Sequence, residues 1–277
     1  MEIEMQANAK VNLALDVLAE REDGYHELDG VMQEIGLHDT LTLETGRGGF
    51  VLFCDHPHLK LNEHNLIYRA WEALRDRVED DAVIIELEKH IPLSAGLGGG
   101  SADAAATLLG LNELWNLELS DEELMDIAAT IDSDTAFFIR GGTQRAQGRG
   151  TDLTKLPSFY GKPLLLINTG ETISSRYVYA RVQPNGALGV SELIDAMPYS
   201  NMKAYTLMQN HLESVAFDSV PHLLKIKQEL LDSGALAALM SGSGPTMFGL
   251  YEDVEEAEAA EQRFRGRYPF VYLTQTV

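Results

Sequence analysis

A glycine-rich segment between residues 92 and 105 carries the residue types best suited to binding an anion. Four of the five residues from Gly96 to Gly100 are glycines, and a helix-forming run begins directly after them. Glycine lets a ligand approach the backbone closely and adopts positive φ without strain. The first amides of a helix have no partner inside the helix and lie at the positive end of its dipole. The segment therefore predicts a phosphate site, with a plain tight turn as the alternative.

Lys10 and Asp134 have the side chains that phosphoryl transfer needs beside a phosphate loop. Lys10 lies in an alternating, strand-like segment, and a buried ammonium needs a partner, for which Asp134 is a candidate. Asp134 precedes an apolar run that we expect to begin a strand, so it is either a helix-end cap or a buried functional acid. Phosphoryl transfer requires a positioned donor, neutralised charge and an oriented acceptor hydroxyl. An ion pair weakens a carboxylate as a base, so we expect orientation and electrostatics to dominate.

Two further segments contain small or aromatic residues whose sequence permits a structural or a binding role. Tyr25 and His26 follow an expected Asp23-Gly24 hairpin turn, and Ser241 to Gly244 reads Ser-Gly-Ser-Gly. Each is either an ordinary turn or part of a site. Asn12, two residues beyond Lys10, shares its strand face.

These segments together resemble the GHMP kinases, the superfamily of galactokinase, homoserine kinase, mevalonate kinase and phosphomevalonate kinase. Pro92, Gly96, Leu97 and Gly98 match the phosphate loop of that family, and Gly99-Gly100-Ser101 replaces its serine pair. The stretches 9–13 with 21–28 resemble an amino-terminal signature, and 240–248 resembles the third motif of the superfamily. All three occur in the family's order.

The resemblance implies a two-domain GHMP fold with the active site in the cleft between the domains, and it implies ATP as the cofactor. It assigns the following residues to the donor nucleotide: Pro92, Leu93, Ser94, Ala95, Gly96, Leu97, Gly98, Gly99, Gly100, Ser101 and Ala102, with Asn65 and Lys89 near the adenosine. Magnesium is expected to arrive with ATP, without a metal-ligand set of the protein's own. Ser101 is a possible contributor.

The resemblance is strongest to a branch whose small-molecule acceptor carries a cytidine diphosphate group. It implies that Asp134 faces the acceptor hydroxyl and that Lys10 supports it. The expected acceptor-binding residues are Asn12, Tyr25, His26 and Tyr179. Asp132 and the pair Thr135-Ala136 depart from the family pattern around Asp134. A kinase of the mevalonate or homoserine class and a non-catalytic nucleotide-binding relative are the alternatives.

Composition narrows the possible partners. The net charge of −22 over 277 residues argues against a nucleic acid or an anionic membrane as partner. Cys54 is the single cysteine, so no intramolecular disulfide forms, which fits a reducing cytoplasm. We expect it to be a buried strand thiol. No run of about 18 apolar residues is present, so no membrane-spanning helix is expected.

The hydrophobic periodicity predicts an α+β chain, because strands and helices mix without strict alternation. A composition change near 150–156 predicts two domains, residues 1–153 and 154–277. Asp103 is expected in the first turn of a buried helix, and Ser120 to Glu123 forms a capping box. Expected helices cover 65–78, 101–115, 191–197, 203–217, 221–233 and 254–265, and expected strands cover 10–18, 41–44, 49–53, 82–87, 164–167 and 270–274, with a strand and loop at 239–251.

Overall fold

The computed structural model describes residues 1–186, 188–199 and 202–277. The chain folds into two compact units, each made of three chain segments. Unit 1 consists of Met1–Ala9, Leu37–Leu93 and Gly98–Gly141. Unit 2 consists of Lys10–Gly36, Ser94–Leu97 and Gly142–Val277. This is a different division from the chain-order domains 1–153 and 154–277, which stay a prediction.

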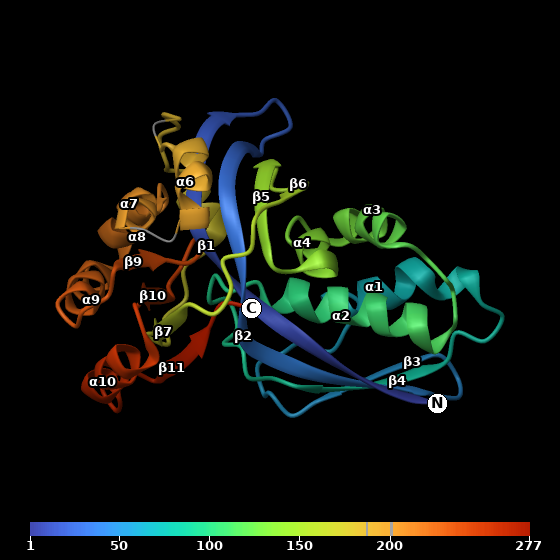
Figure 1. The fold of residues 1–277 in the computed structure, drawn as a ribbon. Helices are drawn as coiled ribbons and strands as arrows, with labels where there is room; N and C mark the ends of the chain where they lie inside the picture. The colour runs from blue at the N-terminus through green and yellow to red at the C-terminus, as the bar shows by residue number, and fades with distance from the viewer. Residues whose placement is uncertain (187, 200–201) are drawn as a thin grey trace. The chain divides into compact units, whose positions relative to one another are not determined.

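Unit 1 is a sheet covered by helices (Figure 1). Two long strands pass through both units, β1 (Glu2–Glu20) and β2 (His26–Thr45). The other elements of unit 1 are β3 (Phe50–Cys54), α1 (Leu66–Leu74), a 3₁₀ turn (Arg75–Arg77), β4 (Val83–Glu88), α2 (Gly99–Leu114), α3 (Asp121–Ile131) and α4 (Thr135–Arg140). Strand β4 pairs antiparallel with β2 and parallel with β3.

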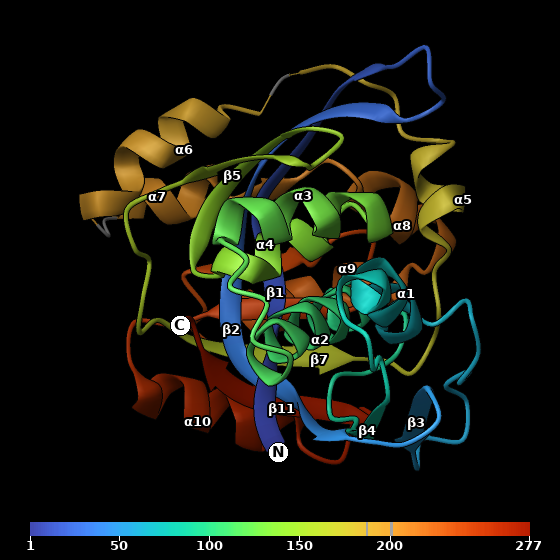
Figure 2. The same cartoon turned by 90° about the vertical axis from the view of Figure 1, so that its right-hand side faces the viewer.

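The centre of unit 1 is α2, most of whose residues are buried. Helices α1 and α2 pack side by side, and α4 packs against both α2 and α3 (Figures 1 and 2). Gly110 permits α2 to approach the sheet, since a Cβ there would lie 2.9 Å from Leu43 Cδ2 on β2. The predicted capping box is confirmed, because Ser120 accepts from the Glu123 amide while the Glu123 carboxylate accepts from the Ser120 amide.

Unit 2 contains a four-stranded antiparallel sheet in the order β11-β7-β10-β9. Helix α9 packs on β9 and β10, and α10 packs on β7 and β11. Strand β2 also pairs with β5, β5 with β6, and β1 runs parallel to β8. The bounds are β5 (Thr143–Gly148), β6 (Asp152–Lys155), β7 (Pro163–Asn168), α5 (Ser175–Tyr179), α6 (Val190–Ala196), a 3₁₀ turn (Met197–Tyr199), α7 (Met202–Leu207), β8 (Gln209–Asn210), α8 (Glu213–Ser219), α9 (His222–Leu231), β9 (Ala237–Met240), β10 (Met247–Leu250), α10 (Val254–Phe264) and β11 (Phe270–Gln275).

Four local expectations are wrong. The run after Asp134 is helix α4 and not a strand, with Asp134 at its N-cap position. The single helix expected over 203–217 is interrupted by β8, which splits it into α7 and α8. The first turn of α2 contains no acidic residue, and Asp103 lies in α2 beyond that turn. Cys54 is only partly buried, at the end of β3.

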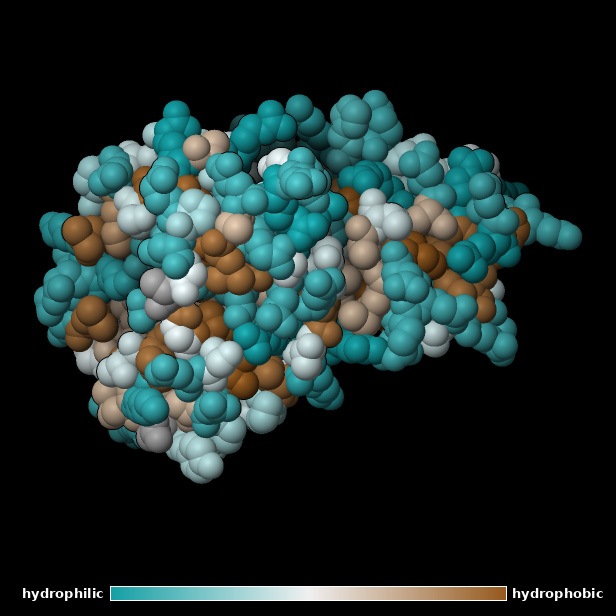
Figure 3. All heavy atoms as spheres, turned by 90° about the horizontal axis from the view of Figure 1, so that it is seen from above, coloured by the Kyte–Doolittle hydropathy of each residue, from teal (hydrophilic) through white to brown (hydrophobic). Residues whose placement is uncertain are grey.

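One face of the protein is mainly hydrophilic. Hydrophilic side chains predominate on the face shown in Figure 3, and apolar ones gather there only in small groups. No helix in the described ranges 1–186, 188–199 and 202–277 is long and apolar enough to cross a membrane.

Candidate functional site

The glycine-rich segment forms a loop that ends at the start of α2. Gly98 is the N-cap residue of this helix, with φ of 73°, and as a glycine it has no side chain to cap the amides of the first turn. Ser94 and Gly96 also have positive φ, at 53° and 77°. The uncapped amides and the helix dipole form the type of anion site that the sequence predicts.

Gly96 is required by a contact that the sequence does not reveal. A Cβ at this position would lie 2.2 Å from the Ser241 carbonyl oxygen and 3.1 Å from the Gly244 nitrogen. The Ser241 hydroxyl donates to the Gly96 carbonyl at 2.8 Å, and the Thr246 amide donates to the Ala95 carbonyl at 3.3 Å. The loops 94–97 and 241–244, both within unit 2, therefore form one assembly of closely packed backbone.

Lys89 lies in a buried ion cluster of unit 1. Its ammonium contacts Asp39 Oδ2 at 2.5 Å and Asp103 Oδ2 at 2.9 Å, and all three side chains are almost fully buried. Asp39 also accepts from the backbone amides of His90 and Ile91. The cluster thus holds the segment that precedes the loop against β2 and α2. The role of Lys89 near the adenosine stays a prediction, and the structure gives this side chain a scaffold role.

The pKa values of Lys89 and Asp103 are both raised in this buried cluster. Burial, the main cause, together with the nearby Asp39 charge raises the pKa of Asp103 to about 8, although Lys89 acts in the opposite direction. The two carboxylates raise the pKa of Lys89 despite its burial. Asp103 Oδ1 is buried without a hydrogen-bond partner in the described part of the chain. A protonated Asp103 is therefore the state that this geometry favours at neutral pH.

Asp132 connects the end of α3 to the phosphate loop. Its carboxylate accepts from the Ser101 hydroxyl at 2.7 Å and from the Asp134 amide at 3.3 Å. Asp132, which departs from the family pattern, thus orders the turn that contains Asp134. The bond brings two hard oxygen groups of unit 1 together, Ser101 Oγ on α2 and Asp132 Oδ2 on the turn.

Lys10 and Asn12 form the corresponding polar pair of unit 2. Lys10 Nζ donates to Asn12 Oδ1 at 2.7 Å, and both residues are almost fully buried on β1. Asn12 Oδ1 also accepts from the Gly242 amide at 3.1 Å. Lys10 and Asp134 belong to different units, and their pairing stays a prediction.

Tyr25, His26 and Tyr179 supply aromatic rings within unit 2. The rings of His26 and Tyr179 lie 5.4 Å apart. The guanidinium of Arg149 covers one face of the Tyr25 ring at 3.8 Å, in a contact that the sequence did not suggest. His26 Nε2 is buried and has no partner among the residues that the structure describes. A buried, unsatisfied ring nitrogen beside a second aromatic ring is suited to receive a planar polar ligand.

Asn65 is the N-cap of α1, where its side-chain oxygen accepts from the Ile67 amide at 2.9 Å and its amide donates to the Lys60 carbonyl. This local role was not predicted, and its role near the adenosine stays a prediction. The remaining candidates Pro92, Leu93, Gly99, Gly100 and Ala102 lie in the loop or the first turn of α2.

Asn210 and Glu213 are polar, buried and absent from the sequence-based candidates. They lie around the junction of β8 and α8 and bond to the backbone of residues 240–242. The signal that could have found them is the polar pair Asn210 and Glu213 around the apolar Leu212 in a segment that otherwise reads as one helix.

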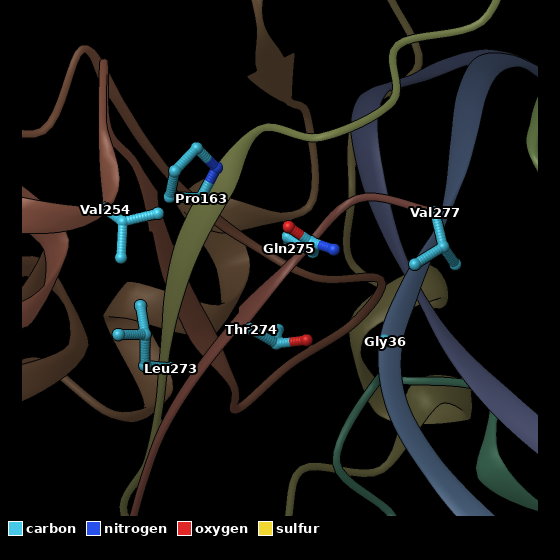
Figure 4. A pocket seen from close by; sticks show the side chains of 7 residues that line it. All are labelled: Gly36, Pro163, Val254, Leu273, Thr274, Gln275 and Val277. Atoms are coloured by element: carbon cyan, nitrogen blue, oxygen red, sulfur yellow. The ribbon is translucent and has the colours of Figure 1, made fainter.

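A shallow pocket lies elsewhere in unit 2 (Figure 4). It has a volume of about 310 Å³ and is lined by Gly36, Pro163, Val254, Leu273, Thr274, Gln275 and Val277. None of its lining residues is a candidate for phosphate, acceptor or base binding. The pocket is therefore separate from the site described above.

Comparisons with known proteins decide the family. The model "GHMP kinases N terminal domain" matches residues 65–142, and "GHMP kinases C terminal" matches residues 193–269. These matches cover more than half of the chain. The chain belongs to the GHMP kinases. The predicted resemblance and the mixed α and β fold class are confirmed.

Curated relatives place the chain more finely within these kinases. It is 41% identical to the 4-diphosphocytidyl-2-C-methyl-D-erythritol kinase of Caldanaerobacter subterraneus subsp. tengcongensis, over 100% of this chain and 98% of that one. It is 39% identical to the enzyme of the same name from Acetivibrio thermocellus, over 99% of both chains.

Solved structures agree with this placement. A crystal structure of 4-(cytidine 5'-diphospho)-2C-methyl-D-erythritol kinase matches with a TM-score of 0.84 and 33% identity over 99% of both chains. The L. major mevalonate kinase in complex with R-mevalonate shares the fold, with a TM-score of 0.77 and 18% identity over 99% of this chain and 95% of that one.

Proposed function

We propose that this GHMP kinase transfers the γ-phosphoryl group of ATP to the 2-hydroxyl of 4-diphosphocytidyl-2-C-methyl-D-erythritol, in the non-mevalonate route to isoprenoid precursors. The observation that carries the proposal is full-length identity of 41% and 39% to kinases named for this substrate. The aromatic group of Tyr25, His26 and Tyr179 supports it, because mevalonate and homoserine contain no base to stack.

ATP is the phosphoryl donor, and its phosphates bind at the loop that precedes α2. The uncapped amides at the start of the helix supply hydrogen bonds to phosphate oxygens, and the helix dipole adds favourable electrostatics. Gly98, with its positive φ, leaves room for this approach. Lys89 lies directly behind the loop, since a Cβ on Gly99 would be 3.2 Å from its ammonium. Lys89 thus stabilises the loop, and Asn65 shapes the start of α1 near the adenosine.

Lys10 and Asp134 act on the acceptor. Asp134 orients the reacting 2-hydroxyl and takes its proton as the bond to phosphorus forms. Lys10, fixed by its bond to Asn12, stabilises the negative charge on the transferring phosphoryl group. Asn12 Oδ1 already accepts two hydrogen bonds, so the side-chain amide nitrogen is the group with which Asn12 binds the substrate.

Tyr25, His26 and Tyr179 bind the cytosine of the acceptor. Base stacking on an aromatic ring is worth about 1–3 kcal/mol. The buried Nε2 of His26 provides a hydrogen-bonding group for the base. Arg149 covers one face of Tyr25 and so leaves the other face for the ligand. This binding energy, remote from the reaction, orients the reacting hydroxyl.

Mg²⁺ accompanies ATP, and the donor set in unit 1 fits it. Ser101 Oγ and Asp132 Oδ2, which lie 2.7 Å apart, are hard oxygen ligands of the kind that Mg²⁺ prefers. No group of three or more His, Cys, Asp or Glu arranged for a metal is found in the described ranges, so phosphate oxygens and water supply the other ligands. When bound, the ion neutralises charge on the phosphates. We place the enzyme in the cytoplasm, where ATP is available.

The test is a kinase assay with purified protein, ATP and a panel of acceptors, with ADP release as the readout. We expect turnover with the cytidine-containing acceptor and far slower turnover with methylerythritol phosphate, mevalonate or homoserine. Asp134→Asn should lower kcat by about a hundredfold or more while ATP still binds. A preference for mevalonate or homoserine contradicts the proposed acceptor, and an Asp134→Asn variant with more than about a tenth of wild-type activity removes Asp134 from its role.

A further inference from the structure

A buried asparagine holds the backbone of the 241–244 loop. The side-chain amide nitrogen of Asn210 donates to the carbonyl oxygens of Met240 and Gly242, both at 2.7 Å. Its side-chain oxygen accepts from the Leu212 amide at 2.9 Å. Only the amide nitrogen can meet two carbonyl oxygens, so these contacts settle which way the amide faces.

The Gly242 residue is held on both sides by asparagine side chains. Its amide donates to Asn12 Oδ1, and its carbonyl accepts from Asn210 Nδ2. Asn12 Oδ1 is in turn the acceptor for Lys10 Nζ. A continuous chain of bonds therefore runs from Asn210 through Gly242 and Asn12 to Lys10, entirely within unit 2.

The surroundings of Gly242 leave it little freedom. Gly242 has φ of 54°, and a Cβ there would lie 3.1 Å from the Gly96 carbonyl oxygen and 3.6 Å from Lys10 Nζ. Glu213 Oε1 accepts from the Met240 amide at 2.9 Å, so Asn210 at the end of β8 and Glu213 at the start of α8 bind both backbone groups of Met240. A displacement of this strand end would therefore be transmitted to Asn12.

We propose that Asn210 is a positioning residue for the kinase reaction, which sets the Gly242 peptide and through it the orientation of Asn12 and the Lys10 ammonium. The inference rests on the proposed function and assigns Asn210 no contact with substrate. An asparagine is suited to this place because one nitrogen supplies both donors. An aspartate would set a carboxylate against two carbonyl oxygens.

The first test compares Asn210→Ala and Asn210→Ser with the wild type. Asn210→Ala should lower kcat by about tenfold or more, because small misplacements of catalytic groups are costly, and should leave the KM for ATP within about twofold. Asn210→Ser keeps one hydrogen-bond donor, so its kcat should lie between those of the wild type and Asn210→Ala. If Asn210→Ala does not fold, Asn210→Ser provides the test instead.

The decisive test repeats Asn210→Ala in an Asn12→Ala background. If Asn210 acts through Asn12, the second substitution should lower kcat by less than about threefold there. The same fold-loss in both backgrounds overturns the proposal, because Asn210 would then act independently of Asn12.

A matched control comes from Asn112, whose side chain also clamps backbone, by bonding both the amide and the carbonyl of Leu119 in unit 1. Asn112→Ala should leave kcat unchanged. Hydrogen–deuterium exchange of residues 240–244 gives a readout without turnover, and it should speed up in Asn210→Ala and not in Asn112→Ala. Unchanged exchange overturns the positioning role, whereas a wild-type protein inactive with every acceptor overturns the proposed function.

Discussion

The side chains of Lys10 and Lys89 are both almost fully buried, and each is held by a different type of partner within its own unit. Lys89 in unit 1 contacts two carboxylates, and one of them, Asp39, is also held by two backbone amides. Lys10 in unit 2 bonds to the amide oxygen of Asn12, which is itself held by the Gly242 amide. Carboxylates neutralise an ammonium, whereas an amide oxygen orients it without taking its charge.

The difference indicates what each lysine does. A buried cation held between the Asp39 carboxylate and the Asp103 carboxyl group fixes three chain segments in place around the start of α2. Within unit 2, Asn12 orients the Lys10 ammonium without neutralising it, as the proposed action of Lys10 on the acceptor and the transferring phosphoryl group requires. Burial and residue type alone do not separate these roles, because the two lysines are buried to a similar extent.

The comparison predicts opposite phenotypes for the same substitution. Lys89→Met removes the cation from a buried pair and should cost about 3–5 kcal/mol of unfolding free energy. Lys10→Met should cost less stability, since a buried amide that loses its partner costs about 1–3 kcal/mol, but should lower kcat by about a hundredfold or more. Denaturant unfolding and steady-state kinetics on both variants measure the two effects.

Lys89→Arg is the control for the first variant, because it keeps the charge and changes the geometry. The structural role of Lys89 is contradicted if Lys89→Met unfolds at the same denaturant concentration as the wild type. The proposed role of Lys10 in the reaction is contradicted if Lys10→Met retains wild-type turnover.

The sequence predicted the parts of the site that are carried by local pattern. The loop at 96–100, the buried α2 and the capping box at Ser120 are set by nearby residues, and glycine content or periodicity reveals them. What escaped prediction depends on contacts between distant segments. The need for glycine at residue 96 comes from the Ser241 carbonyl, 145 residues away, and the role of Asn210 comes from Gly242.

The wrong expectations have the same origin. The segment 203–217 has enough helix-forming residues to read as one helix, but β8 pairs with β1 and breaks it. The apolar run at 135–139 reads as a strand by composition, but packing against α2 and α3 makes it helix α4. Tertiary packing overrides local propensity in both cases.

Two glycines of the loop sharpen the comparison between the units. Gly96 in unit 2 has positive φ and no room for a side chain, whereas a Cβ on Gly100 in unit 1 would meet only Leu66 Cδ1, at 3.6 Å. Gly96→Ala should lose about 1–3 kcal/mol of stability and weaken ATP binding, because a non-glycine residue there is strained. Gly100→Ala should be tolerated, with ATP affinity and stability near those of the wild type.

Isothermal titration with ATP and thermal unfolding of both variants test this pair. Equal effects at the two positions would mean that the loop senses any added methyl group. Gly96 would then have no special constraint from the 241–244 segment.

The smallest expected effect concerns the proton on Asp103. Its pKa of about 8 in the folded protein lies above its ordinary value of 3.8, so the folded state keeps a proton that the unfolded state releases between these values. The free energy of unfolding should therefore fall as pH rises from about 4 to about 8, through this group. Asp103→Asn removes the titration, and the difference in stability between wild type and variant isolates it. Between pH 5 and about 7.5, the free energy of unfolding of Asp103→Asn minus that of the wild type should rise by at least about 1 kcal/mol, as measured by denaturant unfolding. A difference that does not change with pH would mean that Asp103 is ionised throughout, and that Lys89 faces two full negative charges.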